Sequence, residues 1–203
     1  MTEELERGYC ERFEAILQPV AKRLEAHIQD HLIGVKRIDR VTARAKSPDR
    51  FLAKAAKLVD GKQLKYDDPL TQIQDQIGAR IVVLYQSDIQ AASKVVEKYY
   101  FKYEQQTVIP DTHWKFGYFG LHYILKLPPD VVPGESAVEE APQSFELQIK
   151  TLWQHAWSEA NHDLGYKPVE ELTPDQQRRL AYTSAQAWGA DRIFEELFHE
   201  IVA

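Results

Sequence analysis

The apolar residues follow a helical period at the N-terminal end of the chain. They recur at steps of three and four residues, which predicts an amphipathic helix that packs on the domain after it. Pro19 lies inside this run, and we expect a kink or a break there because proline has no backbone N–H. The apolar positions are Leu5, Tyr9, Phe13, Ile16, Leu17, Val20, Leu24 and Ile28.

The period then changes to that of a β-strand. Residues 37–46 alternate between polar and apolar side chains, so Arg40, Thr42, Arg44 and Lys46 share one basic face of a predicted strand. Three further runs are also typical of strands. They cover residues 79–85, which are apolar on both faces as in a central strand, and residues 121–128 and 144–151.

Capping residues mark where three helices should begin. Ser47 is followed by Pro48, which suits the first helical position. Ser87 is expected to cap a helix that covers the sheet, and Thr173 with Gln176 forms a capping box for a long C-terminal helix.

These elements predict an α+β fold with a mixed sheet of about five strands flanked by helices. We expect a single domain over residues 1–203, in which residues 1–34 and 168–203 form helical extensions and residues 35–167 form the core. With 44% apolar residues, the chain can bury one sizeable core.

The composition of the chain excludes some classes of partner and indicates its cellular compartment. The formal charge of −6 argues against a protein that coats nucleic acid, so any site for a polyanion must be local. Cys10 is the single cysteine and cannot form an internal disulfide. The N-terminus does not read as a signal peptide, and no run is apolar enough to span a membrane, so we expect a cytoplasmic protein.

Four polar clusters are candidates for chemistry. In residues 144–151, Phe145, Leu147 and Ile149 should pack, which leaves polar side chains on the other face as a cleft or a solvent-facing surface. Asp75 stands before Gly78 at the mouth of a buried strand, where a carboxylate can hold Mg²⁺. The clusters are Glu146, Gln148 and Lys150; Asp75 and Arg80; Arg40, Arg44, Lys46, Arg50, Lys54 and Lys57; and Lys115, Tyr118 and His122.

Read together, these clusters resemble a known family. The motifs VTARAK, DQIGARI, GYFGLHY, FELQIKT and HAWSEANHDLGYK follow the order and approximate spacing of the synthetase domain of RelA/SpoT proteins. That domain makes the alarmones ppGpp and pppGpp. The resemblance spans roughly residues 38–167, and it implies a nucleotidyltransferase-like sheet. It also implies transfer of the β,γ-pyrophosphate of ATP to the 3′-hydroxyl of GDP or GTP, with AMP as the other product.

The resemblance also implies roles for individual residues. Asp75 corresponds to a Mg²⁺ ligand, and Glu146 to the carboxylate that helps with the metal and accepts the 3′-hydroxyl proton. Tyr118 corresponds to the ring that stacks on the acceptor base. The expected ATP contacts are Arg44, Lys46, Lys54 and Arg80, and the expected acceptor contacts are Lys115, Tyr118, His122 and Gln148.

Several alternatives stay open at this point. Where the family usually has Arg-Ser, this chain has Phe119 and Gly120, which removes a cation on the acceptor side. The acceptor could therefore be the tRNA 3′ end or an adenine nucleotide instead of GDP or GTP. His155, Glu159 and His162 could instead form a metal-hydrolase site. An inactive partner-binding domain is a third reading, and the terminal helices could join copies of the chain or bind a neutralising protein.

Overall fold

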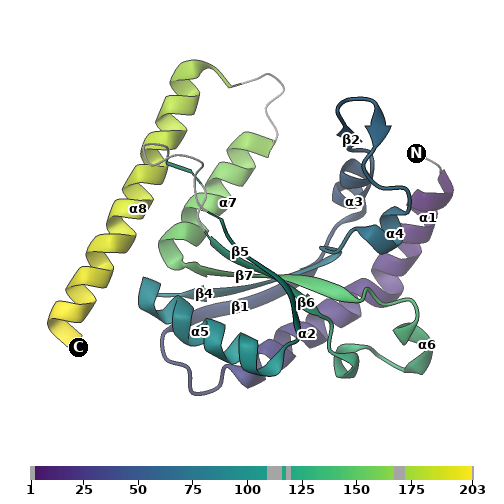
Figure 1. Ribbon diagram of the computed structural model, residues 1–203, viewed down its shortest axis with the longest axis horizontal. Helices are drawn as coiled ribbons and strands as arrows, with labels where there is room; N and C mark the ends of the chain where they lie inside the picture. The colour runs from purple at the N-terminus through teal and green to yellow at the C-terminus, as the bar shows by residue number, and fades with distance from the viewer. Residues whose placement is uncertain (1–2, 109–115, 118–119, 167–171, 203) are drawn as a thin grey trace.

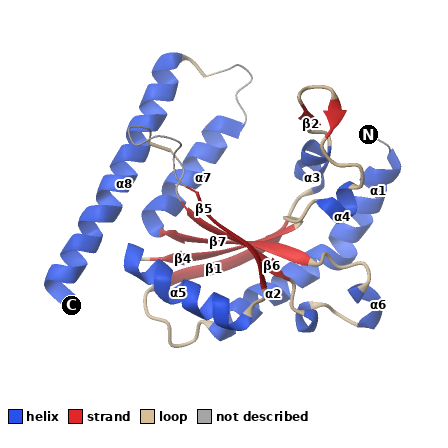
Figure 2. Cartoon of the chain, in the orientation of Figure 1, coloured by secondary structure: helices blue, strands red, loops and turns tan. Residues whose placement is uncertain are grey.

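In the computed structural model, which describes residues 3–108, 116–117, 120–166 and 172–202, five strands form one mixed sheet in the order β1-β4-β7-β6-β5 (Figures 1 and 2). Strands β4 and β7 are parallel, whereas the other neighbouring pairs are antiparallel. The predicted mixed five-stranded sheet is therefore confirmed. The strands are β1 (Ile38–Ala45), β4 (Ile77–Val83), β5 (Lys102–Val108), β6 (Gly120–Lys126) and β7 (Ser144–Thr151).

The core lies where the central strands meet the helices. Phe145, Leu147 and Ile149 on β7 are fully buried, as their alternation predicts, and so are Ile77 and Ile81 on β4. Full burial of a large aliphatic or aromatic side chain contributes roughly 1.5–3 kcal/mol, so these positions fix the register of both strands. That register pairs Gly78 with Glu146 and Arg80 with Gln148.

Helices cover the two faces of the sheet differently. In Figure 1, α2 and α5 lie along one face, while α3 and α7 stand on opposite sides of the other face. Helix α8 runs beside α7 at the edge of the molecule. The bounds are α2 (Gln18–His31), α3 (Pro48–Ala55), α5 (Gln86–Tyr99), α7 (Leu152–Tyr166) and α8 (Pro174–Val202).

The N-terminal helical run is interrupted just ahead of Pro19. Helix α1 (Glu3–Arg12) passes into a π-helical segment, η1 (Phe13–Leu17), before α2 begins at Gln18. The backbone N–H of Gln18 bonds the carbonyl of Phe13, five residues back. Because Pro19 cannot donate a hydrogen bond to the preceding turn, the interruption takes the form of a wider turn, and the chain stays helical.

Two of the three predicted helix starts are at the expected residue. Ser47 occupies the N-cap position of α3 without a side-chain cap bond, and Thr173 with Gln176 forms the capping box of α8 through bonds of 2.8 and 3.3 Å. The prediction for Ser87 is wrong. The N-cap of α5 is Tyr85, two residues before Ser87, and the helix begins at Gln86. The Asp88 carboxylate accepts the N–H of Tyr85 at 3.2 Å.

Several elements were not predicted from the sequence pattern. Strand β5 has six exposed residues of seven and no apolar alternation, so its sequence carried no strand signal. Arg50, Lys54 and Lys57, at helical spacing in the sequence, were expected to share one helical face. That prediction is wrong for Lys57, which lies beyond the end of α3. The other short elements are β2 (Leu58–Val59), β3 (Gln63–Leu64), α4 (Pro69–Gln72), η2 (Pro129–Val131) and α6 (Glu135–Val138).

Strand β1 is an edge of the sheet, and α2 protects its open side. Glu25 on α2 accepts the backbone N–H of Ala43 at 2.8 Å, which satisfies a donor that no neighbouring strand can reach. Such protection prevents an edge strand from pairing with another chain. Within the described ranges, no helix has the length and apolar character needed to cross a membrane.

Candidate active site

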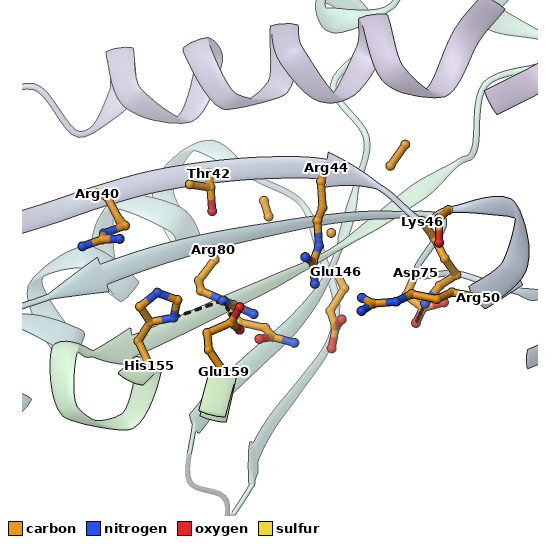
Figure 3. Close-up of a pocket in the computed structure, with 15 residues that line it drawn as sticks. Arg40, Thr42, Arg44, Lys46, Arg50, Asp75, Arg80, Glu146, His155 and Glu159 are labelled. Atoms are coloured by element: carbon orange, nitrogen blue, oxygen red, sulfur yellow. Dashed lines mark hydrogen bonds and ion pairs between the residues drawn. The ribbon is translucent and has the colours of Figure 1, made fainter. Parts of the chain in front are cut away.

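A pocket of about 580 Å³ lies on the face of the sheet between α3 and α7 (Figure 3). Strands β1, β4 and β7 form its floor, and the two helices form its sides. Most of its lining side chains are polar or charged, which suits a polyanionic ligand more than an apolar one. The lining residues are Arg40, Thr42, Arg44, Ala45, Lys46, Ser47, Arg50, Asp75, Gly78, Ala79, Arg80, Glu146, Gln148, His155 and Glu159.

The basic face of β1 forms part of the floor of this pocket. Arg44 projects from β1 toward Glu146, and Lys46 and Arg50 lie near Asp75 (Figure 3). Partial burial lowers the pKa of Arg44, and the neighbouring charges of Arg50 and Arg80 lower it further. An anion bound here would relieve the repulsion among these guanidinium groups.

Gly78 on β4 keeps the pocket open below Arg44, its partner in the β1–β4 register. A Cβ atom added at Gly78 would meet no heavy atom within 4 Å, so space remains beside the backbone for a ligand. A larger side chain at this position would project from the same strand that carries Arg80. The glycine therefore allows a ligand to approach the backbone closely.

Asp75 binds two lysines through one oxygen. Its Oδ2 lies 3.0 Å from the Lys46 Nζ and 2.9 Å from the Lys54 Nζ. Its Oδ1 is buried and has no hydrogen-bond partner among the described residues. Burial by itself raises the pKa of Asp75, but the two ammonium groups outweigh it and hold the pKa below its ordinary value. The carboxylate is therefore charged at neutral pH and has a free ligand position.

Glu146 faces the pocket from β7 and is held by His122 on β6. The distance between the Glu146 Oε1 and the His122 Nδ1 is 2.8 Å. Burial raises the pKa of Glu146, whereas hydrogen bonds from His122 and Gln148 lower it more, so the pKa lies below its ordinary value. The Oε1 of Gln148 is buried, and no described residue donates a hydrogen bond to it.

Arg80 is held at the other end of the pocket by two residues of α7. Its Nη1 donates to the Glu159 Oε1 at 2.7 Å and lies 3.0 Å from the His155 Nδ1 (Figure 3). These contacts contradict the interpretation of His155, Glu159 and His162 as a metal-hydrolase site. The Arg80 guanidinium already binds His155 and Glu159, so neither side chain is available as a metal ligand. No group of three His, Cys, Asp or Glu residues able to hold a metal ion occurs in the part of the chain that the structure describes.

Lys150, the third polar residue of the β7 row, does not line the pocket. It is 2% exposed, and its Nζ lies 3.2 Å from the Ser158 Oγ on α7. Burial, together with the charge of Arg80, lowers its pKa to about 7. The prediction that the whole polar row forms the floor of the cleft therefore holds for Glu146 and Gln148 but is wrong for Lys150.

The structure brings together eight of the ten residues to which the family resemblance gives roles. Two others, Lys115 and Tyr118, lie outside the described residues. His155 and Glu159 also line the pocket, although the sequence suggested them only for a metal-hydrolase site. Their spacing of four residues correctly indicated that they share one face of a helix. The eight residues in or against the pocket are Arg44, Lys46, Lys54, Asp75, Arg80, His122, Glu146 and Gln148.

Sequence comparison finds a similar protein with a named activity. The chain is 28% identical over 166 residues to the GTP pyrophosphokinase YjbM of Bacillus subtilis (strain 168), which covers 81% of this chain and 74% of that relative.

Solved structures share the fold. The small alarmone synthetase 1 of Bacillus subtilis bound to its product pppGpp matches with a TM-score of 0.76 and 24% identity, over 96% of this chain and 99% of that one. A GTP pyrophosphokinase family protein of Streptococcus pneumoniae matches with a TM-score of 0.72 and 21% identity, over 99% of this chain and 96% of that one.

The comparison with family models gives the most direct assignment. Residues 43–171 match the model described as the region found in RelA/SpoT proteins. This range contains Arg44, Asp75 and Glu146 and therefore most of the pocket. The match covers more than half of the 203 residues, and the chain belongs to the RelA/SpoT family.

Proposed function

We propose that this protein is a pyrophosphokinase that moves the β,γ-pyrophosphate of ATP to the 3′-hydroxyl of GDP or GTP, with (p)ppGpp and AMP as products. One observation carries the proposal. A single pocket combines a dense group of cations, a carboxylate with a free oxygen at Asp75, and a second carboxylate oriented by a histidine at Glu146. The activity named for the relative from Bacillus subtilis is the same reaction class.

The cationic side of the pocket binds the triphosphate of ATP. Arg44, Lys46 and Lys54 offer guanidinium and ammonium donors around the junction of β1 and α3, and Arg80 adds a further cation from β4. Transfer of a phosphoryl-type group requires mainly alignment and neutralisation of charge. These side chains supply both.

Glu146 accepts the proton in the transfer step. As the 3′-oxygen of the acceptor forms a bond to the β-phosphorus of ATP, the bond from that phosphorus to the α,β-bridging oxygen breaks. AMP leaves with the bridging oxygen, and the hydroxyl proton moves to the Glu146 carboxylate. Because its pKa lies below the ordinary value, Glu146 is ionised and ready to accept a proton at neutral pH.

The donor set fits a magnesium ion. Mg²⁺ is commonly held by one or two carboxylates together with substrate phosphates. The buried, unpartnered Asp75 Oδ1 would be one ligand, and Glu146 would provide the second carboxylate. When bound, the ion would neutralise charge on the phosphates; the lysines that hold Asp75 keep this carboxylate ionised for the purpose.

The direct test follows label from γ-labelled ATP with purified protein and Mg²⁺. Parallel reactions offer GDP, GTP, ADP, ATP and bulk tRNA as acceptors. We expect label on GDP or GTP in the wild type and none with Glu146→Gln. Label on tRNA or on an adenine nucleotide would retain the chemistry and replace the acceptor, whereas label on none of the five would contradict the enzymatic proposal.

A further inference from the structure

We propose that helix α8 holds residues 116–117 in place, and that Ser184 and Trp188 are positioning residues for the acceptor nucleotide. The inference rests on the proposed function, because it takes Lys115 and Tyr118 as acceptor contacts. It concerns residues 116–117, which the structure describes and which lie between those two positions in the chain.

Two side chains of α8 contact this short segment. The Ser184 Oγ donates a hydrogen bond of 2.8 Å to the carbonyl oxygen of Gly117. One helical turn further on, the Trp188 ring meets the Phe116 ring edge-on, with the ring centroids 5.7 Å apart and the planes at 62°. Consecutive residues of the segment are thus each held by a different kind of contact.

The contact at Ser184 is shielded from water. Ser184 is 2% exposed. If its hydroxyl lost the bond to the Gly117 carbonyl, water could not replace that partner, and the buried hydroxyl would be left unsatisfied at a cost in free energy. The crevice beside it is small, with a volume of about 20 Å³, and Gln154, Trp157 and Asp191 also line it. A bond in such a place holds the segment more firmly than the same bond at the surface would.

Residues 116–117 are adjacent in the chain to the residues expected to bind the acceptor. Lys115 immediately precedes it, Tyr118 immediately follows it, and β6 begins at Gly120 and carries His122 to its bond with Glu146. Fixing residues 116–117 before binding reduces the conformational freedom that the acceptor would otherwise have to remove. The effect should therefore appear in acceptor affinity.

Helix α8 is also linked to β7, the strand that carries Glu146. Asp191 is 2% exposed, and its Oδ2 accepts bonds of 3.2 Å from both Gln86 at the start of α5 and Gln154 in the first turn of α7. Because α7 follows β7 directly, these bonds tie α8 to the strand that carries Glu146. Figure 1 shows α8 and α7 side by side along this contact.

The kinetic test compares Ser184→Ala and Trp188→Ala with wild type in the full-length protein, with GDP varied at saturating ATP and then the reverse. We expect KM for GDP to rise about five- to tenfold in each variant, as the loss of one buried hydrogen bond or aromatic contact implies. KM for ATP and kcat should change less than twofold, and Trp188→Phe should restore most of the affinity for GDP.

The matched control is Thr183→Ala. Thr183 is the neighbouring hydroxyl residue of α8, but its hydroxyl accepts a bond of 3.1 Å from Trp157 on α7 and donates one of 2.8 Å to the Leu180 carbonyl. We expect its KM for GDP to stay at the wild-type value. Equal increases in both KM values for Ser184→Ala, or an unchanged KM for GDP, would overturn the inference while leaving the proposed function intact.

A second measurement does not depend on turnover. Trypsin cleaves after Lys115, at the bond that enters the segment, and mass spectrometry can follow this one cleavage under native conditions. We expect Ser184→Ala and Trp188→Ala to be cut there at least about threefold faster than wild type or Thr183→Ala, because cleavage tracks local opening. Equal rates in all four proteins would overturn the inference even if no acceptor were found.

Discussion

His122 and Glu146 make a diagonal contact across the β6–β7 pair, with 2.8 Å between the histidine Nδ1 and the glutamate Oε1. The register pairs His122 with Gln148 and Ile124 with Glu146, so the two side chains come from adjacent positions on the same face. The imidazole fixes the direction of a half-buried carboxylate that also accepts a hydrogen bond from Gln148.

Replacement of Glu146 by Gln should abolish transfer while leaving the fold intact. The amide has nearly the same shape but cannot take up the hydroxyl proton, and loss of a general base typically costs about 10²–10⁴-fold. The measurement is kcat with ATP and GDP, with thermal unfolding as the control for folding. A variant that retains more than about a tenth of the wild-type rate would contradict the assigned role.

Replacement of Asp75 by Asn should raise the Mg²⁺ concentration needed for half-maximal activity by about 10–100-fold. The amide has no charge, so the free Oδ1 position becomes a weaker ligand. Titration of activity with Mg²⁺ at fixed ATP gives the value. Asp60→Asn, on the exposed turn between β2 and β3, is the control that should behave as wild type.

Removal of the Arg80 side chain should weaken ATP binding. Arg80 lines the pocket and is held by His155 and Glu159, and a charge-assisted contact contributes about 1.5–3 kcal/mol, or about tenfold to 150-fold in affinity. Calorimetric titration of Arg80→Ala with a non-hydrolysable ATP analogue measures the change. Arg192→Ala, whose partner Glu196 lies on the exposed side of α8, should bind the analogue as wild type does.

Replacement of Lys150 by Met should stabilise the protein at neutral pH. The folded pKa of about 7 lies below the ordinary value of 10.5, so between these values the unfolded chain binds more protons and stability falls as the pH is lowered. Methionine does not titrate. We expect a gain of about 1–4 kcal/mol in the free energy of unfolding at pH 7.

The same gain should shrink toward pH 10, because the cost of deprotonating the amine on folding falls as the pH approaches the ordinary pKa of 10.5. Denaturant unfolding at pH 7 and pH 10 compares the two conditions, with Lys126→Met as the exposed control on neighbouring β6. An equal gain at both pH values would show that burial of charge at Lys150 does not limit stability.

The sequence determined the central part of the fold and the chemical types at the site. The alternation of Phe145, Leu147 and Ile149 identified β7 and placed Glu146 and Gln148 on the opposite face, because successive strand side chains point to opposite sides. The motifs around Asp75 and Arg44 indicated the family, and the capping box at Thr173 identified the start of α8.

Only the tertiary structure decided which charged groups meet. The two bonds that join Lys46 and Lys54 to one oxygen of Asp75, and the contact of Arg80 with Glu159, link segments far apart in the chain. Strand β5 carries no apolar alternation and forms by pairing with β6, and Lys150 is buried because α7 packs over it. Local periodicity reports which face of an element is apolar, whereas the partner of that face is set by how the whole chain packs.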